Sequence, residues 1–489
     1  MERAGLKTVP RRDGLALALL AAALVLFKAW LTRAAGVDMH WDEAQYWEWS
    51  RHLDWSYYSK GPWVAWLIAL SEVLFGHGEW QTRLPAWLAH GALLALVYAF
   101  AFEVWRQRAA AWWAVALVLL TPTYFTLSLV MTTDIWLFLF WTWGLWAAYR
   151  ALIHGRSRAW LEAGAAVGLG TLTKLSIGLL PAAVGLAVLL VPRWRHQLRS
   201  PHLWGGLGLM VLLMSPVILW NAAHDWVMLR HEAGHVGHQS WSLERGLVFL
   251  LEQAGALSPL IVAVGLTVWW RPPAEPGPRL LWGLSLGWLA FFFIKALGAK
   301  VQLNWPAPVY LGLLILLAGH LPQSSALKRR LVYGGFVLSL VLMTVAYFPY
   351  SFGLSARQDP FKEVRAWRAP IEALARQAPA VDFIVVPNYK LAGEVAFYWP
   401  RPLPVYVLST AGRRFNQHDL WPGLEQETGR TGLWISTGAA LPAAFTRAFA
   451  RCRTTAAVAA GTPGGVLRTL HSARCSDYRP VSWPQPGSY

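Results

Sequence analysis

Long apolar segments separated by short polar ones occupy the first 350 or so residues of the chain. Segments of this length and spacing are typical of helices that cross a bilayer. We expect about eleven spans, near residues 14–32, 85–104, 110–128, 134–149, 159–173, 176–191, 203–220, 247–270, 280–297, 306–321 and 331–348. No small-residue cleavage site follows the first segment, so we interpret it as a retained helix rather than a signal peptide. The pattern predicts an α-helical multi-pass membrane protein.

Two regions interrupt this pattern. Between the first two spans, residues 33–84 mix acidic and aromatic side chains with one short apolar stretch at 63–75, and we expect two helices there that lie along the membrane surface, at 42–53 and 63–75. From about residue 350 the long apolar runs stop, and 382–387, 404–408 and 432–436 are predicted as strands. The expected domains are therefore 1–349, in the membrane, and 350–489, a small α/β domain outside it.

Composition agrees with a membrane protein. Hydrophobic residues make up 56% of the chain and charged residues only 14%, against about 25% in soluble domains. The net charge of +17 does not indicate nucleic acid as a partner, because Lys and Arg are spread between the apolar segments. They concentrate after the even-numbered spans, which makes that side cytoplasmic and puts segment 33–84 and the C-terminal region outside.

Acidic residues on the expected outer side are the first candidates for chemistry. Asp42 and Glu43 lie among Trp and Tyr residues, and Asp134 opens the fourth span. A carboxylate in such a position can act as a general base, and two from separate loops can converge on one polar substrate. The alternative is that these acids only favour the starts of helices, through capping or the helix dipole.

Basic residues on the same side form a second group, Lys60, Arg83, Lys174 and Lys300. Lys174 interrupts an otherwise continuous apolar run, and a cation at that depth needs an anion such as a phosphate at the headgroup level. The alternative is a side chain that extends to the membrane surface without binding anything. Cys452 and Cys475, both in the C-terminal domain, either form a disulfide or are two buried thiols.

The sequence His231-Glu232-Ala-Gly-His235 matches the zinc motif H-E-x-x-H. Gly234 weakens a helix at this point, and the motif is short enough to arise by chance. A metal site at His231 and His235 is therefore one interpretation and a solvent-facing His-rich loop is the other. No cofactor is otherwise indicated, and a divalent metal is left open.

Several motifs, taken in order, resemble those of bacterial membrane glycosyltransferases of the protein mannosyltransferase and lipid A aminoarabinose transferase families. They cover the membrane region and comprise Asp42-Glu43, Tyr57-Tyr58-Ser59-Lys60-Gly61-Pro62, Arg83-Leu84-Pro85, Met131-Thr132-Thr133-Asp134, Thr173-Lys174, Ser215-Pro216, Trp220-Asn221, Arg230-His231 and Asn304-Trp305-Pro306-Ala307-Pro308. The chain departs from the aminoarabinose transferases at Ser59, where they carry a Glu linked to metal binding.

The resemblance implies a GT-C fold and an inverting glycosyltransferase in the bacterial inner membrane, with its active site facing the periplasm. The donor would be a polyprenyl-phosphate sugar of the undecaprenyl type, and the acceptor a lipid A or other glycolipid, a glycan or a protein. Asp42, Glu43 and Asp134 would be catalytic. Donor phosphate and sugar would be bound by Tyr57, Tyr58, Lys60, Arg83, Lys174, Lys300 and Asn304. We expect a monomer among membrane lipids.

Two other classes of protein remain as alternatives. A transporter or flippase for lipid-linked sugars would place charges near the bilayer midplane and show an internal repeat, and neither is evident in the sequence. A membrane zinc protease rests on the segment from His231 to His235 alone.

Overall fold

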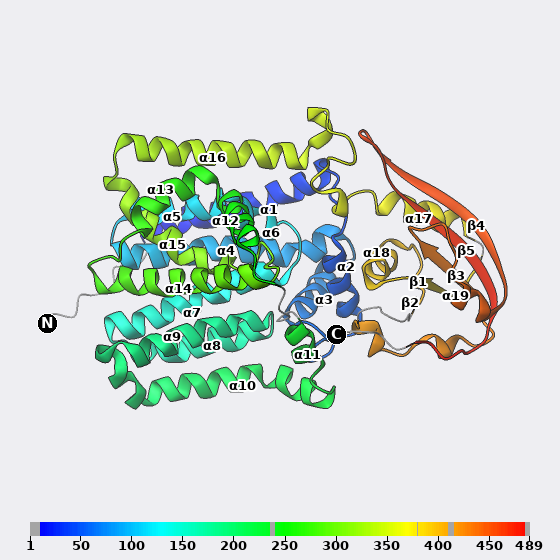
Figure 1. The fold of residues 1–489 in the computed structure, drawn as a ribbon, viewed down its shortest axis with the longest axis horizontal. Coiled ribbons are helices and arrows are strands. Elements are labelled where there is room, and N and C mark those ends of the chain that lie inside the picture. The colour runs from blue at the N-terminus through cyan, green and yellow to red at the C-terminus, as the bar shows by residue number, and fades with distance from the viewer. Residues whose placement is uncertain (1–9, 235–239, 379, 409–414, 485–489) are drawn as a thin grey trace. The chain divides into compact units, whose positions relative to one another are not determined.

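The computed structural model describes residues 10–234, 240–378, 380–408 and 415–484 (Figure 1). Two compact units emerge from its packing. The first, here called the helical unit, comprises Met1–Ala29, Arg83–Leu219 and Gly237–Met343. The second, the mixed unit, comprises Trp30–Thr82, Trp220–Val236 and Thr344–Tyr489. The mixed unit therefore joins the segment after the first apolar helix to the C-terminal part of the chain.

Every apolar segment expected to span the membrane forms helix in the structure. The helices are α1 (Arg11–Ala34), α4 (Glu79–Trp105), α5 (Arg108–Leu119), α6 (Pro122–Leu127), α7 (Thr133–His154), α8 (Ala159–Thr171), η1 (Leu175–Gly178), α9 (Leu179–Leu190), η2 (Pro192–Arg199), α10 (Pro201–Ala223), α12 (Leu243–Leu257), α13 (Pro259–Trp269), α14 (Pro276–Gly298), α15 (Ala307–His320), η3 (Leu321–Gln323) and α16 (Ala326–Tyr347). Among the described residues, five helices are long and apolar enough to cross a membrane, or up to seven with two bent pairs. The total of eleven spans stays a prediction.

Helix α15 forms the centre of the helical unit. All its residues from Ala307 to Gly319 are buried, and it packs against α5, α7, α13 and α14. Its sequence carries no charged side chain over this stretch, which is what a helix needs when neighbours surround it on all sides.

Two expected spans are not continuous helices. Segment 247–270 is divided into α12 and α13, which meet at an angle of 105°. Pro259 follows the break and Ser258 has a φ of +79°, so the chain turns there instead of continuing the hydrogen-bond ladder. Segment 110–128 likewise ends α5 at Leu119 and restarts as α6 at Pro122. In both places apolar residues continue on either side of the break, and a proline marks where the second helix begins.

The mixed unit combines helices with one sheet. Its elements are α2 (Trp41–Arg51), α3 (Trp63–Phe75), α11 (Val227–Gly234), η4 (Pro349–Phe352), η5 (Lys362–Val364), α17 (Arg368–Gln377), β1 (Phe383–Val386), α18 (Tyr389–Tyr398), β2 (Val405–Val407), η6 (Gln417–Asp419), η7 (Leu424–Glu427), β3 (Gly432–Ser436), α19 (Ala443–Arg447), β4 (Phe449–Thr462) and β5 (Gly465–Tyr478). The two short helices expected within 33–84 are present as α2 and α3. Their position at a membrane surface stays a prediction.

The five strands are ordered β2-β1-β3-β5-β4. β1 pairs in parallel with β2 and β3, whereas β5 pairs antiparallel with β3 and β4 (Figure 1). The three strands expected from the sequence are β1, β2 and β3. The long hairpin of β4 and β5 was missed, because β4 is largely exposed and neither strand carries a long apolar run.

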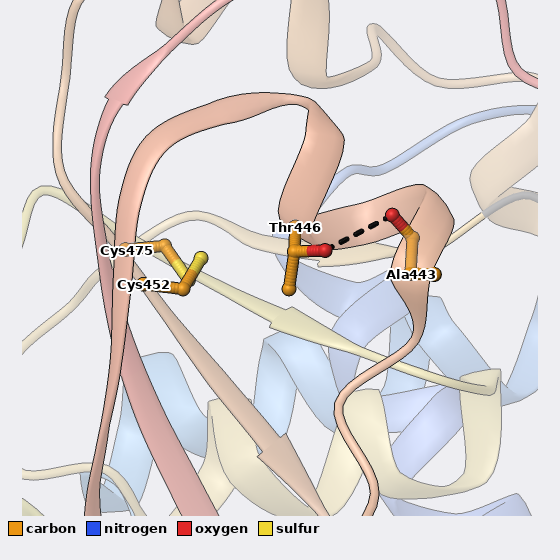
Figure 2. Close-up of a disulfide and its surroundings, with 4 residues drawn as sticks. All are labelled: Ala443, Thr446, Cys452 and Cys475. Carbon is orange, nitrogen blue, oxygen red and sulfur yellow. Dashed lines mark hydrogen bonds between the residues drawn. A yellow bond between two sulfur atoms is a disulfide. The ribbon is translucent and has the colours of Figure 1, made fainter.

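A disulfide joins the strands of this hairpin. Cys452 and Cys475 are directly opposite in the β4–β5 register, and their sulfur atoms are 2.02 Å apart (Figure 2). Of the two states left open by the sequence, the paired one is therefore confirmed.

Helix α2 packs closely on α18 within the mixed unit. A side chain at Gly393 of α18 would place its Cβ 2.7 Å from the carbonyl carbon of Ala44. Glycine at this position lets the two backbones approach, so α2 is firmly seated on the element that follows β1 in the sequence.

Candidate functional site

Asp134 is the centre of a polar cluster in the helical unit. It lies in the first turn of α7, where the hydroxyl of the N-cap residue Thr132 accepts a hydrogen bond from its backbone N–H at 3.3 Å. Its carboxylate accepts two further hydrogen bonds, from Lys174 Nζ to Oδ1 and from Asn304 Nδ2 to Oδ2, both at 2.9 Å. The Asp134 side chain is only 8% exposed and that of Lys174 13%. The structure thus brings together three residues that the sequence singled out separately.

The local sequence explains why these side chains meet. Lys174 occupies the break between α8 and η1, in an extended conformation that ends the hairpin of α7 and α8. Asn304 lies in the segment that leads into α15, just before Pro306. The anion that the buried Lys174 ammonium requires is therefore supplied by the chain itself. A carboxylate has about four acceptor positions, so Asp134 retains capacity for a ligand.

The other two expected cations of the helical unit do not form part of this cluster by any described contact. Arg83 is buried within α4, and Lys300 is exposed after the end of α14. Lys295 was not singled out from the sequence, yet its Nζ lies 4.6 Å from the ring centre of Trp305, the residue after Asn304. The sequence signal that could have identified Lys295 is its position, one turn from the end of an apolar helix.

Asp42 and Glu43 have different environments at the start of α2. Glu43 is fully buried and accepts a hydrogen bond from the backbone N–H of His40, while the His40 side chain accepts one from Asp42 N–H. This reciprocal arrangement is a capping box. The Asp42 side chain is 42% exposed, and its Oδ2 lies 3.9 Å from Nδ1 of His40. Glu43 thus stabilises the helix end, and the Asp42 carboxylate is accessible.

Lys60 is part of a second polar group, in the mixed unit. Its Nζ donates to the backbone carbonyl of Ser59 at 2.8 Å and lies 3.4 Å from Oε1 of Glu232 in α11. The Lys60 side chain is 17% exposed and that of Glu232 40%. Such a long and partly solvated ion pair contributes little net free energy to the stability of the fold. An anionic ligand can therefore replace Glu232 at low cost.

The two tyrosines before Lys60 are buried. Tyr57 stacks on Trp49 with ring centres 4.4 Å apart, and its hydroxyl donates to the carbonyls of Trp49 and His52. Burial raises the pKa of the Tyr57 hydroxyl. Tyr58 packs edge-on against His231 at 4.8 Å, and its backbone N–H donates to Gln417 at 2.8 Å. Both tyrosines therefore hold the loop that presents Lys60.

These contacts also describe two residues of the H-E-x-x-H sequence. Glu232 pairs with Lys60, and His231 is buried against Tyr58. His235 lies outside the described residues. Within the part of the chain that the structure describes, no three His, Cys, Asp or Glu side chains gather as metal ligands.

The fold has solved counterparts. The structure of ArnT from Cupriavidus metallidurans bound to undecaprenyl phosphate superposes with a TM-score of 0.67 at 17% sequence identity, over 94% of this chain and 98% of that one. The apo structure of the same protein matches equally well. The helical unit together with a sheet-containing unit is thus the architecture of a known membrane glycosyltransferase fold.

Relatives and a family model agree with the fold. The model for dolichyl-phosphate-mannose-protein mannosyltransferase matches residues 59–220. Lipid A galacturonosyltransferase RgtD of Rhizobium johnstonii is 29% identical over 416 residues, which are 82% of this chain and 86% of that protein. Undecaprenyl phosphate-alpha-4-amino-4-deoxy-L-arabinose arabinosyl transferase 1 of Pseudomonas fluorescens is 27% identical over 60% of this chain and 56% of its own length. These matches support the resemblance to GT-C membrane glycosyltransferases that the sequence motifs indicated.

Proposed function

We propose that this protein transfers a sugar from undecaprenyl phosphate to a lipid A-type acceptor, with inversion, at the periplasmic face of the bacterial inner membrane. The relatives support the donor and acceptor, since they are a lipid A galacturonosyltransferase and undecaprenyl-phosphate-dependent transferases. The observation that carries the proposal is the Asp134 carboxylate, held by Lys174 and Asn304 among the largely apolar helices of the helical unit. Ionisable side chains retained in such surroundings are generally functional.

The reaction requires one base and one stabilised leaving group. An acceptor hydroxyl or amine attacks the anomeric carbon, the bond from that carbon to the phosphate oxygen breaks, and the base takes the acceptor proton. Undecaprenyl phosphate departs with the electron pair of the broken bond. The accessible Asp42 carboxylate is our candidate for the base, and the Asp134 cluster is our candidate for binding the hydroxyl groups of a substrate.

Lys60 is our candidate for the donor phosphate. Its ammonium is partly exposed and its bond to Glu232 is long, so a phosphate oxygen can take the place of the Glu232 carboxylate. A cation at this position stabilises the charge that develops on the leaving phosphate. The packing of Tyr58 against His231 supports the loop during this exchange. Tyr57, Arg83, Lys300 and Asn304 remain proposed donor contacts.

The wider organisation is proposed as follows. Residues 1–349 form the catalytic membrane domain, 350–489 form a periplasmic domain, and the protein acts as a monomer. No described contact favours a zinc protease, since Glu232, the base in that interpretation, is paired with Lys60.

A direct assay tests the function. The full-length protein in lipid nanodiscs is incubated with lipid A and with undecaprenyl phosphate carrying galacturonic acid or 4-amino-4-deoxyarabinose. Mass spectrometry should detect lipid A heavier by one sugar, and nuclear magnetic resonance should show the anomeric configuration inverted. Asp42→Asn should lose the product, while Glu372→Gln, in the exposed part of α17, should retain it. Equal product from the wild type and from the double variant Asp42→Asn, Asp134→Asn would overturn the proposal.

A further inference from the structure

A polar cavity lies within the mixed unit, and none of the residues proposed above to be catalytic or to bind the donor lines it. Its volume is about 820 Å³. Small-molecule sites commonly measure about 300–1,000 Å³. Three stretches line it, namely the C-terminal half of α2, residues 402–407 with β2, and residues 415–426, and we call it the α2–β2 pocket. It is therefore large enough for one or two sugar rings.

A buried carboxylate with unused capacity lines this pocket. Oε2 of Glu48 lies 3.3 Å from Nε2 of His418, and these two side chains are only 9% and 8% exposed. Oε2 of Glu48 nevertheless accepts no well-formed hydrogen bond from the described residues. A buried carboxylate oxygen that accepts no well-formed hydrogen bond costs free energy unless a ligand or water supplies one. The pocket thus offers an acceptor that is ready for a ligand hydroxyl or amine.

Flat aromatic faces accompany this polar pair. The Trp421 ring lies 4.6 Å from that of His52 and 5.2 Å from that of His418, measured between ring centres. Trp47 and Trp483 also line the pocket. Aromatic side chains offer a large apolar contact area at small entropic cost, and the carbon-bound hydrogens of a sugar ring form the matching apolar face. Aromatic faces beside carboxylates are a chemistry suited to saccharides.

The charge of the pocket further restricts the kinds of ligand that it can bind. Among the described residues that line it, Glu48, Asp419 and Glu425 bring three carboxylates, and the guanidinium of Arg51 lies 2.9 Å from Glu72. Burial lowers the pKa of His52, which disfavours a positive charge on this imidazole. Like charges repel a phosphate from such a lining, and hydroxyl or amino groups are favoured.

We infer that the α2–β2 pocket binds a non-phosphorylated sugar ring of the acceptor. This inference rests on the proposed function, and it adds the acceptor subsite. Helix α2 carries the candidate base Asp42 in its first turn and Glu48 six residues later, about 9 Å along the axis. One rigid helix therefore sets the separation between the bound acceptor ring and the base. Recognition of the acceptor is thereby assigned to the unit that contains the C-terminal sheet.

Binding and turnover test the subsite separately. Calorimetry measures the affinity of the full-length protein in nanodiscs for the lipid A saccharide freed of acyl chains and phosphates. We expect Trp421→Ala and Glu48→Gln to weaken binding about tenfold or more, and to raise the acceptor KM with kcat and donor KM unchanged. A tenfold loss corresponds to about 1.4 kcal/mol. Trp421→Phe should retain most of the affinity, which distinguishes a lost ligand contact from a damaged fold.

Matched controls lie elsewhere in the mixed unit. Phe352→Ala removes an exposed aromatic ring and Glu372→Gln a partly exposed carboxylate, both outside the pocket, and neither should change binding. Unchanged affinity and acceptor KM in Trp421→Ala and Glu48→Gln would overturn the inference while leaving the proposed function intact. Saccharide binding without any transfer by the wild type would instead contradict the proposed function. A ligand that binds only with its phosphates attached would also overturn the inference.

Discussion

The Asp134 cluster and the Lys60 pair are both lysine–carboxylate contacts, yet they are built differently. In the helical unit, Lys174 and Asn304 hold the Asp134 carboxylate at 2.9 Å each, and little of the two charged side chains is exposed. In the mixed unit, Lys60 and Glu232 are 3.4 Å apart, and Glu232 is 40% exposed. A buried pair is costly to break because one charge is left uncompensated, whereas an exposed pair exchanges partners readily. The first suits a permanent part of the site, and the second suits a place where a charged ligand comes and goes.

The largest effect should come from separating Lys174 and Asp134. Lys174→Met leaves the Asp134 carboxylate buried without its cation, and we expect a loss of about 3–5 kcal/mol in stability together with all transfer activity. The double variant Lys174→Met, Asp134→Leu removes both charges and should regain most of the stability but none of the activity. Thermal unfolding and the transfer assay measure the two effects. A double variant as active as the wild type would show that the cluster serves folding alone.

Substitutions at Asp42 and Glu43 should separate activity from stability, with Asp42 affecting mainly activity and Glu43 mainly stability. Asp42→Asn is expected to lower kcat by about 10²–10⁴-fold, the usual contribution of a general base, with little change in stability because the side chain is 42% exposed. Glu43→Gln keeps the side-chain oxygen that caps α2 and should retain both activity and stability. Glu43→Ala should cost about 0.5–2 kcal/mol as a lost cap. The reverse order of kcat effects would reassign the base to Glu43.

The smallest effects should come from substitutions in the pair of Lys60 and Glu232. Lys60→Met is expected to raise the donor KM roughly tenfold or more, as for loss of one hydrogen bond to a charged group, with stability changed by less than about 1 kcal/mol. Glu232→Gln removes the competing carboxylate and should leave the donor KM unchanged or lower it. Initial rates at varied donor concentration measure both. A rise in donor KM for Glu232→Gln as large as for Lys60→Met would mean that the pair acts as one structural unit.

Three features of the structure were not predicted, because local sequence patterns carry little signal for them. The break between α12 and α13 lies inside a largely apolar run. Hydropathy does not detect a backbone turn there, and only Pro259 marks its position. Strand β4 is the largely exposed edge strand of its sheet, and β5 buries polar as well as apolar residues, so the hairpin carries no clear apolar alternation to detect. Glu48 and His418 are 370 residues apart in sequence, and no local pattern indicates that two such distant residues are in contact.

The sequence by itself determined the class of protein, the helical segments and most candidate site residues, since hydrophobic length, charge distribution and ordered motifs are local properties. Tertiary structure alone decided which candidates are partners. It joined Asp134 with Lys174 and Asn304, turned the glutamate of an apparent zinc motif into the partner of Lys60, and packed α2 on α18 through Gly393. It also gathered residues 30–82 and 344–489 into one unit, and so created the α2–β2 pocket. Contacts of this kind depend on how distant segments fill space against one another, and a linear pattern carries no record of that packing.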